Sequence, residues 1–140
     1  MKYPIDSVKL IDLPLVPERR GNLTFVEGDV HIPFAIKRVY YLYDIPSGAE
    51  RGQHAHKELQ QLIICMSGSF SIVIDDGNST KEFFMDSPSK GLYLPPMIWR
   101  DIKSFSKGSV CMVLASEVYL ESDYIRNYST FILQAQSSSL

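Results

Sequence analysis

The 140-residue sequence has few cysteines, no excess of one charge sign and no long apolar run. Cys65 and Cys111 form no CxxC motif and lie inside apolar runs, so we expect two buried free thiols and no zinc site. The formal net charge of -2 excludes a general attraction to nucleic acid or anionic membrane. No segment approaches the roughly 20 apolar residues that span a bilayer, and the acidic, proline-containing first twenty residues do not resemble a signal peptide. We therefore expect a cytoplasmic protein with no nucleic-acid or membrane partner.

Short apolar segments separated by turn residues indicate β-strands along nearly the whole chain. The expected strands are 9–14, 23–27, 36–44, 59–66, 69–75, 81–85, 91–94, 99–105 and 109–116. This pattern predicts a single all-β domain over residues 1–140, a barrel or sandwich for which a jelly roll suits the strand number. One short C-terminal helix is expected near 122–127, where Ser122 would cap and Ile125 would pack, followed by a frayed tail over about 132–140.

The segment with the most chemical information contains His54 and His56, which follow a glycine-rich approach. Residues two apart share one face of a strand, and in a small barrel that face can be the interior. Two imidazoles directed into one cavity need partners for their nitrogens, which favours a functional site over two structural histidines. Glu58 lies on the same strand face, so strand parity alone leaves it open as a metal ligand.

This segment resembles the first signature of the cupin superfamily, and its matching residues are Gly48, His54, His56 and Gly68. The second cupin signature falls within residues 91–100, where Gly91 and Pro95 fit the pattern. The place of the third histidine, however, holds Arg100, and Gln60 and Gln61 occupy the neighbourhood of the usual glutamate.

These two departures argue against a metal ion. A cupin metal site needs three neutral imidazoles and a carboxylate, whereas the guanidinium of Arg100 is cationic and has no lone pair to donate. The histidines are then free to act as acid and base, and a neighbouring Arg100 would keep an imidazole neutral and stabilise oxyanion charge. We expect no metal and no cofactor, and a site suited to enolisation next to a carbonyl.

Several short segments, in order, carry a narrower resemblance: 20–23 (RGNL), 32–34 (IPF), 36–41 (IKRVYY), 51–57 (RGQHAHK), 75–77 (DDG), 86–88 (DSP), 91–93 (GLY), 113–116 (VLAS) and 123–126 (DYIR). Over about residues 20–128 the chain is similar to the dTDP-sugar 3,4-ketoisomerases of the FdtA and QdtA type, which include WxcM-like domains. The resemblance implies an RmlC-like cupin barrel.

The resemblance also implies an isomerase that converts dTDP-4-keto-6-deoxyglucose, without a metal, into a dTDP-3-keto-6-deoxyhexose. That reaction would serve 3-amino-deoxysugar biosynthesis for surface polysaccharides such as O-antigen. His54 would be the base that takes the C3 proton, His56 would relay protons between the oxygens, and Tyr40 would hydrogen-bond the sugar. Arg38 and Arg51 would clamp the pyrophosphate, which bidentate guanidinium groups match.

By the same resemblance the protein is expected to form a homodimer with exchanged N-terminal strands, so that Arg20 reaches a site. Family members differ at the positions of Arg20 and Arg100 according to whether the C4 hydroxyl ends axial or equatorial. One type has Arg at the position of Arg20 and His at the position of Arg100. The other type has Tyr at the first of these positions and Arg at the second. This chain has arginine at both positions and therefore matches neither type. Arg100 favours the glucose configuration over the galactose configuration. Trp99 has two interpretations, stacking on a ligand ring or packing in the core.

Three alternatives stay open beside the ketoisomerase. A sugar-nucleotide 3,5-epimerase would also need a base, with a tyrosine acid on the opposite ring face. A non-catalytic cupin that binds a sugar nucleotide would keep the barrel without turnover. A metal-dependent oxygenase is disfavoured by the missing third histidine and carboxylate.

Overall fold

The computed structural model describes residues 3–137. Its helical segments are η1 (Ile5–Ser7), η2 (Glu121–Asp123) and α1 (Tyr128–Ser137). Its strands are β1 (Lys9–Asp12), β2 (Leu15–Val16), β3 (Leu23–Thr24), β4 (Arg38–Leu42), β5 (Arg51–His56), β6 (Gln61–Ser67), β7 (Phe70–Asp75), β8 (Thr80–Met85), β9 (Lys90–Leu94), β10 (Trp99–Lys103), β11 (Val110–Ala115) and β12 (Tyr124–Ile125).

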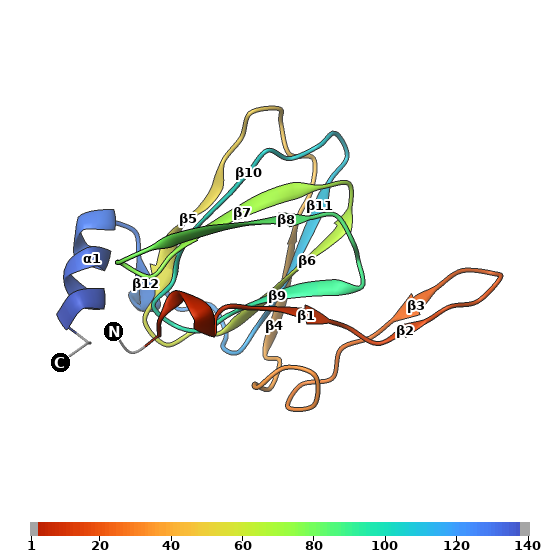
Figure 1. Ribbon diagram of the computed structural model, residues 1–140, viewed down its shortest axis with the longest axis horizontal. Coiled ribbons are helices and arrows are strands. Elements are labelled where there is room, and N and C mark those ends of the chain that lie inside the picture. Colours follow the sequence, from red (N-terminus) through yellow and green to blue (C-terminus); the bar gives the residue numbers. More distant parts are fainter. Residues whose placement is uncertain (1–2, 138–140) are drawn as a thin grey trace.

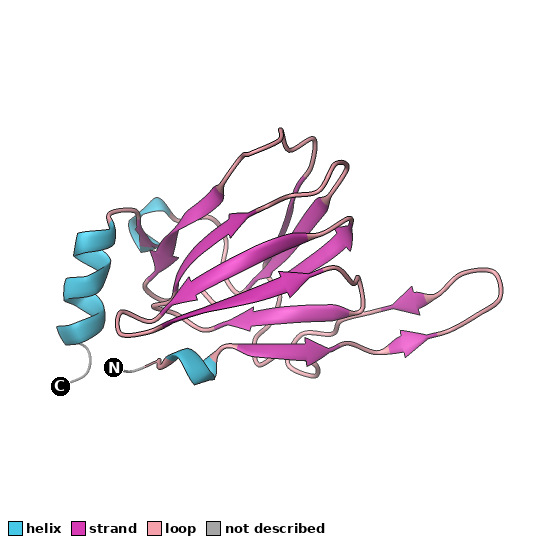
Figure 2. Ribbon diagram, turned by 45° about the horizontal axis from the view of Figure 1, so that its top comes forward, coloured by secondary structure: helices cyan, strands magenta, loops and turns pink. Residues whose placement is uncertain are grey.

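The strands form two five-stranded sheets that face each other (Figure 1). One sheet has the order β1-β9-β6-β11-β4 and the other the order β12-β5-β10-β7-β8, and every pairing between these strands is antiparallel. The short pair β2–β3 forms a hairpin that extends away from the body, at the end opposite α1 (Figure 2). This arrangement is the jelly-roll type that the strand pattern predicts.

Residue alternation along each strand decides which side chains reach the interior. In β4, Val39 and Tyr41 are exposed while Arg38, Tyr40 and Leu42 are half-buried and line the barrel cavity. Strand β6 is instead buried over its first five residues, because its second face is covered as well. A strand covered on both faces is expected to be apolar, as residues 62–65 are, and the exception is Gln61, a fully buried amide at the start of the strand.

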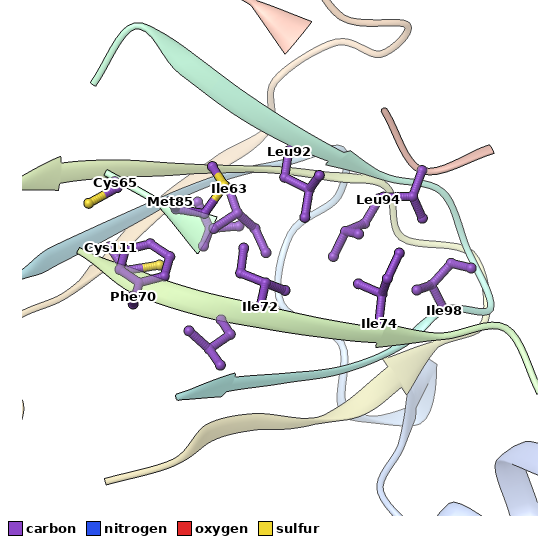
Figure 3. Packing of buried hydrophobic residues seen from close by; sticks show 13 residues of the cluster. Ile63, Cys65, Phe70, Ile72, Ile74, Met85, Leu92, Leu94, Ile98 and Cys111 are labelled. Carbon is purple, nitrogen blue, oxygen red and sulfur yellow. The ribbon is translucent and has the colours of Figure 1, made fainter. Parts of the chain in front are cut away.

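The main core lies between the two sheets. Figure 3 shows Ile63, Leu92 and Leu94 facing Ile72 and Ile74 across the gap, and all five are at most 1% exposed. This apolar cluster fills one part of the barrel, so the polar residues described below are confined to the other part. The core therefore fixes the strands that carry the site.

The nine strands expected from the sequence are all present, but their bounds differ. Strands β8 and β9 begin one residue earlier than expected, β6 ends one residue later, and the other six are shorter. The expected helix position is wrong. Residues 122–127 hold most of η2 and strand β12, where Ile125 is buried and pairs with Ala55 of β5. The helix begins at Tyr128, directly after Asn127, whose side-chain oxygen accepts the Thr130 amide at 2.9 Å. Asparagine at this position is a favourable N-cap.

The expected frayed tail over about 132–140 is also wrong for the part that the structure describes. Residues 132–137 continue α1, and Phe131 and Ala135 pack in a small cluster with Ala55 and Ile125. Tertiary packing, rather than helix propensity, stabilises this segment. Residues 138–140 lie outside the described residues. Within 3–137, no helix is both long and apolar enough to cross a membrane.

The attachment of α1 depends mainly on Phe131, whose side chain is 0% exposed. We predict that Phe131→Ala lowers the free energy of unfolding by about 3 kcal/mol, because a buried aromatic ring is lost and a cavity remains. Leu133→Ala in the same helix is the control, since Leu133 is 70% exposed and should change stability by less than about 0.5 kcal/mol. Urea denaturation of both variants makes the comparison, and equal losses would contradict the packing described here.

Candidate active site

The barrel contains a cavity of about 340 Å³ between strands β4, β5 and β10. Its wall combines apolar side chains from the core with a concentration of cationic and titratable groups. The lining residues are Arg38, Tyr40, Leu42, Arg51, Gly52, Gln53, His54, Ile63, Arg100, Ile102, Val113, Tyr124 and Arg126. Such a mixture of an apolar wall and a few convergent polar groups is typical of a small-molecule site.

Strand β5 places His54 directly opposite Arg100 of β10 in the antiparallel register. Next to this pair the register shifts: Ile102, two residues after Arg100 on β10, pairs with Arg51, three residues before His54 on β5. Gly52 lies within this bulge with a φ of 71°, a conformation that favours glycine. The bulge brings Arg51 to the mouth of the cavity and leaves His54 inside it.

His54 is held in its neutral form. Burial, the charge of Arg100 and the charge of Arg126 lower the pKa of His54 to about 3. Its Nε2 atom is buried and has no hydrogen-bond partner among residues 3–137. A neutral imidazole with a buried, unpartnered nitrogen inside a cavity is suited to accept a proton from a bound molecule.

His56 is buried beside His54, with ring centroids 4.7 Å apart and nearly perpendicular planes. Its Nδ1 lies 3.1 Å from the carboxylate of Asp123, which also accepts the backbone amides of Glu58 and Leu59. Because Asp123 only accepts, Nδ1 carries the proton and Nε2 keeps its lone pair. Burial, and then Arg100 and His54, lower the pKa of His56 below its usual range.

A hydrogen-bonded chain connects Arg100, Gln61 and Tyr40 behind the cavity wall. The Arg100 guanidinium donates to Gln61 Oε1, and Gln61 Nε2 donates to the Tyr40 hydroxyl at 2.9 Å. Arg100 is 2% exposed, and burial lowers its pKa to about 10, so it stays cationic at neutral pH. Burial raises the pKa of Tyr40, which keeps its hydroxyl protonated.

Three further arginines surround the opening. The guanidinium of Arg38 lies 5.2 Å from the Tyr40 ring centroid and 5.6 Å from that of Tyr119, and its buried Nε has no partner among the described residues. Arg51 is exposed at the start of β5. Arg126 lies 4.2 Å from the Tyr124 ring centroid and is held by Glu121. In a protein of net charge -2, this concentration of guanidinium groups favours an anionic ligand.

Two residues expected at the site lie elsewhere within the chain. Trp99 does not line the cavity, because on β10 it faces away from Arg100 and packs on Tyr128 and Phe131. The packing interpretation of Trp99 is the one that the structure supports. Arg20 lies in the β2–β3 hairpin, pairs with Glu18 and has a side chain that is 85% exposed. It is outside the cavity of its own chain.

The sequence interpretation gave no role to Gln61, Asp123, Tyr124 or Arg126, although all four belong to the site. The short strand β12 pairs Tyr124 with His56, and its ring lies 4.9 Å from that of His54. A helix was expected over these residues, so their strand parity could not be used. Asp123 follows the two histidines by more than sixty residues, and only the fold brings them together.

The residues present do not fit a divalent metal ion. Residues 3–137 contain no group of three or more His, Cys, Asp or Glu side chains placed to hold one. The third imidazole position is taken by Arg100, a cation without a lone pair, and Glu58 donates only its backbone amide to Asp123. No step of the chemistry is therefore assigned to a metal.

The fold and the site together define a jelly-roll barrel of the cupin class whose paired histidines face an arginine in place of a complete metal-ligand set. A dTDP-4-dehydrorhamnose 3,5-epimerase from Bacillus anthracis shares this fold, with a TM-score of 0.74 over 84% of this chain and 76% of its own at 19% identity. The chain belongs to the FdtA family (WxcM-like, C-terminal), whose family model matches residues 6–136.

Relatives in this family match nearly the whole chain. A TDP-4-oxo-6-deoxy-alpha-D-glucose-3,4-oxoisomerase from Aneurinibacillus thermoaerophilus is 46% identical over 123 residues, which is 88% of each protein. The sugar 3,4-ketoisomerase QdtA from Thermoanaerobacterium thermosaccharolyticum, solved with TDP, is 42% identical, with a TM-score of 0.94 over 98% of this chain and 100% of its own. A histidine-to-asparagine mutant of QdtA was solved with TDP-4-keto-6-deoxyglucose. It is 42% identical, with a TM-score of 0.91 over 93% of this chain and 94% of its own.

The neutral state of His54 makes stability depend on pH. Between its folded pKa of about 3 and its ordinary value of 6.5, the unfolded chain binds a proton that the folded chain does not. We predict that this group lowers the free energy of unfolding as pH falls from 7 to 5, by up to about 2 kcal/mol. His54→Gln should lose less stability over that interval in urea denaturation. An equally steep decline in the variant would contradict a depressed His54 pKa.

Proposed function

We propose that this protein is a 3,4-ketoisomerase that converts dTDP-4-keto-6-deoxyglucose into a dTDP-3-keto-6-deoxyhexose. The observation that carries this proposal is the neutral, buried His54 opposite Arg100 inside a cavity with arginines at its mouth. The family membership and the substrate named for the relatives supply the chemical class of the ligand. The reaction would serve 3-amino-deoxysugar biosynthesis.

The isomerisation needs only proton transfers. His54 Nε2 takes the C3 proton, the electrons of that bond form an enediolate between C3 and C4, and a proton returns to C4. The O3 hydroxyl loses its proton and O4 gains one, so substrate and product have the same composition. Arg100 stabilises the negative charge that develops on oxygen, and Tyr40 donates to the same region. His56, with Nδ1 fixed by Asp123, relays protons between the two oxygens.

The nucleotide would be held by its diphosphate. We assign Arg38 and Arg51 to this clamp, because a guanidinium matches phosphate oxygens in a bidentate manner and both line the cavity. Arg126 adds a third cation at the opening, where Glu121 already orients it. The glucose or galactose configuration of the product at C4 stays open, since Arg20 and Arg100 match neither family pairing.

We also propose a homodimer in which the β2–β3 hairpin of one chain packs on the partner. An apolar groove of about 790 Å³ runs between this hairpin and the outer face of the sheet that contains β4 and β11. Leu15, Val16 and Leu23 of the hairpin are about half exposed in the single chain, which is costly unless a second copy covers them. The exchange would bring Arg20 to a partner's site. The free buried thiols of Cys65 and Cys111 suit a reducing cytoplasm.

The first test is proton NMR of dTDP-4-keto-6-deoxyglucose incubated in D₂O with chelator-treated protein. We predict a 3-keto sugar that carries deuterium at C4, with the H4 signal reporting the C4 configuration in H₂O. His54→Asn should lower kcat by about 10²–10⁴-fold because the base is lost, while TDP affinity changes little because the diphosphate contacts remain.

Other outcomes separate the alternatives. Deuterium exchange at C5 with inversion would indicate the epimerase, and binding of TDP without any change in the sugar would indicate a non-catalytic cupin. Activity that is lost with the chelator and restored by one metal would contradict the metal-free mechanism.

The proposed dimer predicts that Leu23→Asp, which puts a charge on the hairpin, produces a monomer in sedimentation equilibrium. Wild-type protein should have twice the chain mass of 15.9 kDa. Leu133→Asp is the matched control, because Leu133 is 70% exposed on α1 at the opposite end of the molecule. A wild-type monomer, or a Leu23→Asp dimer as stable as the control, would contradict this interface.

A further inference from the structure

Gln61 is a fully buried side chain at the start of β6 that does not line the cavity. It nevertheless contacts two residues that do, Arg100 and Tyr40. A buried amide between a guanidinium and a tyrosine must satisfy both its oxygen and its nitrogen, because unsatisfied polar groups are costly in the interior. The orientation of the Gln61 amide therefore determines which groups of Arg100 and Tyr40 donate and which accept.

The orientation of the Gln61 amide follows from the chemistry of Arg100. A guanidinium can only donate, so the amide oxygen must face Arg100 and the amide nitrogen must face Tyr40. The Tyr40 oxygen then accepts a hydrogen bond from Gln61 at 2.9 Å. Its own proton is left for an acceptor on the cavity side. Tyr40 is thereby fixed as a donor toward a sugar oxygen.

The neutral amide also leaves the charge of Arg100 uncompensated. The other acceptor of Arg100 is the backbone carbonyl of Ile98, at 3.2 Å from Nη2 and 3.3 Å from Nε. Within residues 3–137 no carboxylate forms an ion pair with Arg100, and both of its acceptors are neutral. The full positive charge therefore acts on His54 across the strand pair.

We propose that Gln61 is a positioning residue that makes the Tyr40 hydroxyl a donor into the cavity and preserves the uncompensated charge of Arg100 beside His54. This inference rests on the proposed isomerase function, which it deepens. Gln61 lies in the neighbourhood where a cupin metal site has its glutamate, and a carboxylate there would not serve these two purposes. A carboxylate would accept the Tyr40 proton and cancel the charge of Arg100 at once.

The proton affinity of His54 would reveal whether a carboxylate had replaced the amide at position 61. The titratable and charged groups that face it are Arg100 from β10, Arg126 after β12, Glu121 from η2, His56 from β5 and Tyr124 from β12. Only Glu121 among these favours the protonated form, and it is itself paired with Arg126. A second, buried carboxylate at position 61 would add a much stronger attraction, because charges interact strongly in the interior.

The test is Gln61→Glu, a nearly isosteric change that replaces the amide by a carboxyl group. Gln60→Glu is the matched control, because it makes the same change one residue earlier in the chain. Gln60 is directed to the other side, where its Oε1 accepts the Tyr93 hydroxyl at 2.7 Å. All assays contain a chelator, since a carboxylate near two histidines could recruit a metal ion. Near-ultraviolet circular dichroism establishes that each variant is folded.

We expect Gln61→Glu to lower kcat/KM at pH 7 by about tenfold or more, because Tyr40 donates to the new carboxylate instead of the sugar. We also expect kcat/KM to fall at least about threefold further between pH 7 and pH 5 as His54 becomes protonated. In wild type and Gln60→Glu this acid limb should be absent. A Gln61→Glu pH profile that matches the control would overturn the proposal.

Two measurements keep the test decisive. If Gln61→Glu does not fold, the volume-conserving Gln61→Met is combined with Tyr40→Phe. The second change should then add little to the loss of kcat, and multiplied losses would overturn the proposal.

If wild type turns over no 4-keto sugar, the isomerase function fails by itself. Ring-proton NMR of folded Gln61→Glu must still show His54 titrating above pH 5, unlike wild type, or the proposal fails too.

Discussion

The site is arranged around one buried cation, the guanidinium of Arg100. An uncompensated charge in a protein interior is expensive, and Arg100 is tolerated because its donors meet neutral acceptors on Gln61 and Ile98. Burial lowers the pKa of His54 and of His56, and the charge of Arg100 lowers both further, so the two imidazoles stay neutral. The missing negative charge would arrive with the substrate, first as a diphosphate at the opening and then as the enediolate. The site is therefore more stable electrostatically when occupied by an anion than when empty.

The apolar part of the barrel makes this arrangement possible. Leu42 and Ile102 both line the cavity and pack in the main core, so the strands that carry Tyr40 and Arg100 are held by the same contacts that stabilise the fold. Functional groups on strands are placed more accurately than groups on loops. The one irregular element is the bulge at Gly52, which separates an exposed arginine from an enclosed histidine within four residues of one strand.

The fold class could be predicted from the sequence because strand periodicity and turn residues are local signals, and every expected strand is present. The histidine pair could also be found, since a spacing of two residues has one meaning on a strand. The error at residues 122–127 has a physical cause: the segment contains only a two-residue strand, too short for a periodic pattern, and Ile125 is buried by pairing rather than by a helix. Asp123 could not be placed for the same reason. Trp99 is a different case, because alternation along β10 puts it on the face opposite its neighbour Arg100, and a cavity position for Arg100 therefore already excludes one for Trp99.

Arg100 and Gln61 stand beside the histidines where a metal-binding cupin would have further ligands, and this decides what the histidines can do. A bound metal would occupy the imidazole lone pairs, whereas here Nε2 of both His54 and His56 is buried without a partner among the described residues and is available for protons. The roles of Arg100 and Gln61 also depend on each other. A glutamate at position 61 would cancel the charge of Arg100, and a histidine at position 100 would remove the donor that orients the amide of Gln61. In the mechanism proposed for this site, the keto group would move between neighbouring carbons with a side-chain cation as the electrostatic stabiliser, and that role requires that the cation has no carboxylate beside it.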